Sequence, residues 1–95
     1  MIIAMLTYIK PIEEIDTYLV AHRAFLDEGY EKGYLLVSGP RIPRTGGILI
    51  SPLKDKDAFM HYLSRDPFYV EGLVNYELIS FDPIKKHPVL ATLLE

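Results

Sequence analysis

Four short apolar runs, separated by two segments of helical periodicity, constrain the fold of this chain more than any other feature. The runs are rich in β-branched and aromatic residues, which favour strands, and they cover residues 2–9, 34–38, 48–51 and 74–81. A proline follows each run within two residues, and proline ends a strand because it lacks the amide hydrogen that pairs the ladder. The sequence therefore predicts four strands with sharp ends.

Helical periodicity follows the first run and the third. Residues 11–33 begin with a proline and acidic side chains, which suit a helix start, and glycine favours an end near position 33. The predicted inner face of this helix, at spacings of three and four, holds Ile15, Leu19, His22 and Leu26. A second helix is predicted over residues 55–65, and residues 66–68 (Asp-Pro-Phe) break it and start a short helical turn.

The order of these elements is β-α-β-β-α-β, which is the split βαβ pattern. It predicts an α+β, ferredoxin-like fold in which a four-stranded antiparallel sheet carries two helices on one face. A chain of 95 residues suits one domain over 1–95, with residues 83–95 as a C-terminal tail.

The predicted strands are apolar on both faces. A sheet with helices on one side normally has a polar outer face. The second face must therefore be covered, and we expect a homodimer packed sheet against sheet. The alternatives are coverage by the tail or an exposed apolar patch that serves as a ligand floor.

Composition excludes several classes of function. The net charge is −3, with 10 basic and 13 acidic residues, so a nucleic-acid-binding protein is not expected. The absence of cysteine removes disulfides, thiolate metal sites and cysteine nucleophiles, and it fits a cytoplasmic protein. The apolar N-terminus is too short for a membrane span and lacks the features of a signal peptide.

No motif indicates a metal or a cofactor. The three histidines, His22, His61 and His87, lack the spacing of metal ligands. Gly46-Gly47 is not followed by the lysine of a phosphate loop, and a nucleophile elbow is absent. We expect a protein without metal or cofactor that binds a small molecule.

Two residues are candidates for chemistry, and each has an ordinary structural interpretation. His22 lies in an apolar stripe, where a buried neutral histidine is common, but histidine is also the side chain best suited to general base catalysis near neutral pH. Asp66 precedes a proline and suits a helix N-cap. It also continues the inner face of its helix, so it can alternatively be a carboxylate that orients His22.

The chain resembles the YCII-related (YciI-like) family. The matching features are His22, residues 33–40 (GYLLVSGP), Gly46-Gly47, residues 65–68 (RDPF) with Glu71-Gly72-Leu73 after them, and a last strand ending at Phe81 before Pro83 and two lysines. These features keep their order and spacing from residue 1 to about residue 86. Their combination is more specific than any one of them.

The resemblance implies a dimeric α/β barrel with a pocket centred on a histidine and an aspartate, which correspond to His22 and Asp66. It also implies that Ser38 and Gly39 line the pocket. Many members have an arginine three residues before the histidine, where this chain has Leu19. Arg41 or Arg44 is the candidate to supply that charge to a substrate.

Two functions follow. The first is a cofactor-independent lyase or isomerase that uses the histidine–aspartate pair for proton transfer on a small cyclic or aromatic substrate, since one relative in the family is a dehydrochlorinase. The second is a non-catalytic dimeric module that binds a small molecule or assists another enzyme, which the leucine at position 19 favours. A third, structural interpretation is a plain dimer without a pocket.

Overall fold

The predicted ferredoxin-like fold is confirmed by a computed structural model, which describes residues 1–94. Its antiparallel sheet has the order β2-β3-β1-β4. Strand β1 (Ile2–Tyr8) is central and pairs with both β3 (Gly46–Ser51) and β4 (Val74–Ser80), whereas β2 (Val37–Pro40) is an edge strand. The central place of β1 satisfies its backbone hydrogen bonds on both edges.

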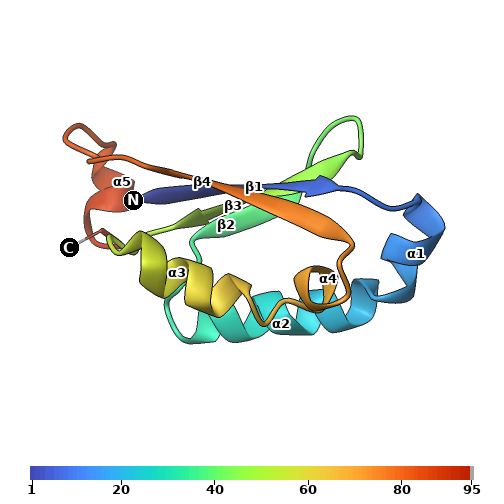
Figure 1. The fold of residues 1–95 in the computed structure, drawn as a ribbon. Coiled ribbons are helices and arrows are strands. Elements are labelled where there is room, and N and C mark those ends of the chain that lie inside the picture. The colour runs from blue at the N-terminus through green and yellow to red at the C-terminus, as the bar shows by residue number, and fades with distance from the viewer. Residues whose placement is uncertain (95) are drawn as a thin grey trace.

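Three helices cover one face of the sheet. Figure 1 shows α2 (Leu19–Glu31), α3 (Lys56–Leu63) and α4 (Pro67–Val70) below the strands, with no helix above them. Asp55 caps α3 by accepting the amide hydrogens of residues 57 and 58, which fixes its start. None of the helices in residues 1–94 is long and apolar enough to cross a membrane.

The first predicted helix is two helices. Helix α1 (Ile12–Thr17) ends at Tyr18, whose backbone leaves the helical region (φ −107°, ψ 9°), and α2 begins at the next residue. The hydroxyl of Thr17 donates to the carbonyl oxygen of Glu13 at 3.1 Å, a bond that bends helices. The periodicity continues through the break because both helices still turn an apolar side toward the sheet.

The second strand begins later than the sequence predicts. Gly33 has φ +77°, and the amide of Tyr34 donates to the carbonyl oxygen of Gly29 at 2.8 Å, so α2 ends in a Schellman turn. That turn uses residues 34–36 to bring the chain back to the sheet, and Leu35 enters the core there. The strand runs from Val37 to Pro40, where proline is tolerated because β2 is an edge.

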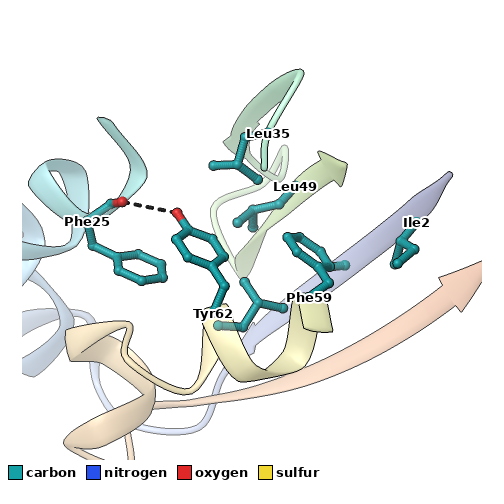
Figure 2. Close-up of a cluster of buried hydrophobic side chains, with 8 residues drawn as sticks. Ile2, Phe25, Leu35, Leu49, Phe59 and Tyr62 are labelled. Atoms are coloured by element: carbon teal, nitrogen blue, oxygen red, sulfur yellow. Dashed lines mark hydrogen bonds between the residues drawn. The ribbon is translucent and has the colours of Figure 1, made fainter. Parts of the chain in front are cut away.

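The core lies between the sheet and the helices. Figure 2 shows its larger cluster, in which Phe59 and Tyr62 of α3 and Phe25 of α2 pack against the strand residues Ile2 and Leu49. A second cluster is centred on Phe68 of α4, and it contains Leu6, Ile15, Leu73 and Val74. The two clusters form opposite ends of the helix-covered face.

The outer face of the sheet carries an apolar row at one end, although Glu77, which pairs with Met5, lies on the same face. Ile50 pairs with Val37 and with Ile3, and Ile3 pairs with Ile79 on the other side, so one row of four side chains crosses all the strands. Val37 and Ile79 are 54% and 46% exposed. The tail does not cover this row: its short helix α5 (Pro88–Ala91) lies at the end of the sheet beside the N-terminus (Figure 1). Residue 95, the last of the predicted tail, lies outside the described residues.

Candidate functional site

His22 lies on the inner face of α2, and its ring is held flat against Phe68 of α4. The two ring centroids are 4.0 Å apart with 7° between their planes, and the histidine is 8% exposed. Tyr8 meets the same phenylalanine edge-on at 6.3 Å. The imidazole is therefore fixed in orientation by packing before any hydrogen bond is considered.

Asp66 is fully buried and accepts hydrogen bonds from three different elements. Its Oδ1 lies 2.8 Å from Nδ1 of His22 and accepts the backbone amide of Phe68 at 3.1 Å, while its Oδ2 accepts the hydroxyl of Tyr76 at 2.5 Å. When the carboxylate is ionised it only accepts, and Nδ1 is then the donor of this hydrogen bond. The aspartate is both the N-cap of α4 and the partner of His22; the two sequence interpretations describe one side chain.

Tyr76 completes the group. It lies on the inner face of β4, and burial together with the neighbouring Asp66 charge raises the pKa of its hydroxyl. The phenol therefore stays protonated and remains a donor to the carboxylate. The carboxylate of Asp66 is thus held by three hydrogen bonds.

His22 also lines a cleft of about 440 Å³ between α2 and the strands β2 and β3. Its other ring nitrogen, Nε2, has no hydrogen-bond partner among residues 1–94. The lining is mostly apolar and comes from Leu6, Leu19, Leu26, Leu49 and Phe68. An imidazole with one nitrogen free of protein partners thus lines a cavity of the size of a small ring compound.

The other predicted site residues divide between the cleft and the solvent. Ser38 and Gly39 line the cleft, and the hydroxyl of Ser38 hydrogen-bonds that of Tyr30 at 2.7 Å. Arg41 is exposed and is not part of the lining, whereas Arg44, three residues later in the same loop, is. Arg23 of α2 also lines the cleft.

Gly46 and Gly47 form part of the cleft wall where β3 begins. A Cβ atom at Gly46 would lie 1.9 Å from the carbonyl oxygen of Leu6, so only glycine lets the two strands approach this closely. The glycine pair, whose sequence excludes a phosphate loop, therefore has a packing role beside the site.

Sequence reasoning missed Tyr76 and Phe68. Tyr76 alternates with Val74 and Leu78 on the inner face of the last strand, so its side was predictable, but its hydroxyl bond to Asp66 depends on how the strand and α4 meet. Phe68 belongs to a quoted motif, and only the structure gives its stacking on His22. Within residues 1–94, no group of three or more acidic or histidine side chains could hold a metal.

Comparisons with known proteins give a family and a fold. The family model of the YCII-related domain matches residues 1–82. The solved structure of 5-chloro-2-hydroxyhydroquinone dehydrochlorinase from Burkholderia phenoliruptrix, in complex with 2,5-dihydroxybenzoquinone, is similar with a TM-score of 0.70 over 86% of this chain and 94% of that chain. The identity is 21%, at which the likeness shows the fold alone. No curated protein sequence matches the chain.

Proposed function

The chain belongs to the YCII-related family, and on that premise we propose that it transfers a proton on a small cyclic or aromatic substrate without a cofactor. The observation that carries the proposal is the two-sided environment of His22. Asp66 holds Nδ1 from the buried side, at 2.8 Å, while the same ring lines the cleft and its Nε2 has no hydrogen-bond partner among residues 1–94. A histidine oriented in this way is suited to general acid–base catalysis.

In the proposed mechanism, Nε2 removes a proton from a hydroxyl or carbon of the substrate. The electron pair of the broken bond forms a new π bond. In an elimination the leaving group departs with its bonding electrons, and in an isomerisation His22 returns the proton to another atom. Asp66 stabilises the imidazolium that forms between these steps and keeps the ring in place, with Tyr76 fixing the carboxylate.

The lining supports a ring-shaped substrate. Its apolar side chains and the ring of Phe68 offer flat, water-excluding contacts, and a volume of about 440 Å³ suits a molecule of one or two rings. The similar dehydrochlorinase structure holds a dihydroxybenzoquinone. We extend that ligand class, a hydroxylated six-membered ring, to this cleft as a proposal.

A panel of chlorinated hydroxyaromatic and cyclic carbonyl compounds tests the proposal by ultraviolet absorbance and chloride release. We expect turnover of at least one compound, with His22→Ala and Asp66→Asn each lowering kcat by about 10² to 10⁴-fold, the usual contribution of a general base. His61→Ala is the matched control, because His61 is exposed on α3. Full activity in His22→Ala would exclude the proposed base.

The second candidate is a module that binds a small molecule without converting it. Leu19 favours it, because it lines the cleft where the family resemblance leads one to expect an arginine. The same panel separates the two functions. Binding of a ring compound to the native chain, with no turnover of any member, would support the module.

We further propose that a second copy covers the apolar outer face of the sheet. The row formed by Val37, Ile50, Ile3 and Ile79 is the supporting observation, since partly exposed apolar rows of this kind mark interfaces. Sedimentation of the native chain and of Ile3→Lys measures the association; the variant should be monomeric. The cytoplasmic location expected from the sequence stays a prediction.

A further inference from the structure

The charged side chains of the cleft are all basic. Arg23 and Arg44 contribute to the lining, and no aspartate or glutamate does. This is unusual for a chain with a net charge of −3, in which acidic residues outnumber basic ones. The excess of positive charge is local, and a cleft lined by one sign of charge concentrates ligands of the opposite sign.

Arg44 is held in position at this cleft. One guanidinium nitrogen donates to Oδ1 of Asp16 at 2.6 Å, and the guanidinium carbon lies 5.7 Å from the centre of the Tyr8 ring. The Asp16 bond raises the pKa of Arg44, so its charge is permanent. A guanidinium has five N–H donors, so the pairing with Asp16 leaves others for a ligand in the cleft.

A continuous aromatic wall joins Arg44 to His22. The guanidinium lies over Tyr8, Tyr8 meets Phe68 edge-on at 6.3 Å, and Phe68 stacks on His22 at 4.0 Å. His22 and Arg44 both line the cleft, and the ring contacts through Tyr8 and Phe68 fix their positions relative to one another.

From this arrangement we propose that the cleft selects ring compounds that carry an anionic oxygen group, such as a carboxylate or phenolate, and that Arg44 is the residue that binds that group. The proposal rests on the proposed use of the cleft as the substrate site, and it names the class of substrate. Arginine suits this task because its planar fork matches a carboxylate with two parallel hydrogen bonds.

Benzoate and benzamide test the proposal, since they have nearly the same shape and differ in charge. Their dissociation constants are measured by NMR titration in low salt on the native chain, Arg44→Ala, Arg44→Lys and Arg41→Ala. Arg41 is the matched control, an exposed arginine of the same loop outside the cleft lining. Backbone amide spectra check that each variant is folded.

We expect the native chain to bind benzoate about tenfold more tightly than benzamide, the effect of one charge-assisted contact. Arg44→Ala should remove that preference, Arg44→Lys should keep part of it, and Arg41→Ala should keep all of it. Equal affinity for the two probes in the native chain, no binding of either, or a preference unchanged by Arg44→Ala would overturn the proposal.

The same titration on His22→Ala separates this proposal from the proton-transfer function. Loss of turnover without loss of the benzoate preference leaves Arg44 as the anion-binding residue. If the panel of substrates shows no turnover at all, the preference of the native chain for benzoate still stands as evidence for the anion site. A preference that disappears in His22→Ala and persists in Arg44→Ala assigns the anion to the histidine and overturns the proposal.

Discussion

Helix α2 contributes two ring stacks, one turn apart, that have nearly the same geometry and different chemistry. In the closed stack, Phe25 lies on Tyr62 with ring centroids 4.3 Å apart and 13° between their planes. In the open stack, His22 lies on Phe68 at 4.0 Å and 7°. Each stack joins a residue of α2 to a residue that follows in α3 or α4.

The two stacks differ in where their polar atoms lead. The hydroxyl of Tyr62 donates to the carbonyl oxygen of Phe25 at 3.0 Å, so the closed stack satisfies its polar atom within itself (Figure 2). The open stack connects through Asp66 to Tyr76 and also contributes His22 to the lining of the cleft. The comparison shows that ring packing fixes the orientation of a side chain in both stacks. Only the stack that also has a buried carboxylate and a neighbouring cavity is suited to proton transfer.

Removal of the carboxylate should produce the largest effect. Asp66→Ala leaves the Nδ1 of His22, the hydroxyl of Tyr76 and the amide of Phe68 without their acceptor, so we expect a loss of about 3 to 5 kcal/mol in the free energy of unfolding. Asp55→Ala removes an exposed N-cap of α3 and should cost about 1 kcal/mol. Urea denaturation measures both.

The difference between the losses in Asp66→Ala and Asp55→Ala measures the contribution of the buried hydrogen bonds beyond that of a helix cap. Equal losses in Asp66→Ala and Asp55→Ala would mean that Asp66 acts as a cap alone, and the distinction between the stacks would fail. Asp66→Asn, which keeps the shape of the side chain, provides a folded protein if Asp66→Ala does not fold. Its loss should lie between those of the two alanine variants.

The two buried tyrosine hydroxyls should differ next. Tyr76→Phe removes a hydrogen bond to a buried carboxylate and should cost about 1.5 to 3 kcal/mol, whereas Tyr62→Phe removes one to a neutral carbonyl and should cost about 1 kcal/mol. Urea denaturation again gives the values. A larger loss in Tyr62→Phe would reverse the comparison, since it would place the stronger polar contact in the closed stack.

Alkaline titration should give the smallest but most direct signal. Burial raises the pKa of both Tyr62 and Tyr76, with the charge of Asp66 as a further cause in each. These two tyrosines, of the seven in the chain, should therefore not ionise near pH 10 while the fold persists. Because their folded pKa values lie above the unfolded value, their contribution to stability is complete below about pH 10 and is lost as the pH rises above it.

Absorbance at 295 nm, followed beside near-ultraviolet circular dichroism, separates the two phases of that titration. Tyr62→Phe and Tyr76→Phe should each remove one phenol from the late phase and leave the early phase unchanged. Ionisation of all the tyrosines in one phase, with native dichroism retained, would contradict the buried environment of both hydroxyls.

The fold was predictable because its determinants are local. Each strand ends at a proline or shortly before one, and apolar residues at spacings of three and four define the inner faces of the helices. The break at Tyr18 was not predictable from periodicity, because α1 and α2 share one apolar stripe and a hydrogen bond from the Thr17 side chain bends the chain between them. The start of β2 depends on the turn after Gly33, which consumes three residues that have strand composition.

The site was predictable in part. His22 and Asp66 stand out as polar residues on apolar helical faces, and the topology places both helices on one side of the sheet, so their contact could be anticipated. Tyr76 carries no such signal, since a tyrosine on the inner face of a strand is ordinary. Which of Arg41 and Arg44 lines the cleft depends on the path of their loop. The loop sequence has no periodic pattern, so only the structure separates the two arginines.

The spacing of the two stacks has a mechanical consequence. His22 and Phe25 are three residues apart on one continuous helix, so α2 cannot slide or rotate at one stack without moving the other. The position of the imidazole is therefore coupled, through α2 and Phe25, to the core around Phe59 and Tyr62. Changes of side-chain volume at Phe59 or Tyr62 should therefore shift the position of the His22 ring, even though neither residue lines the cleft.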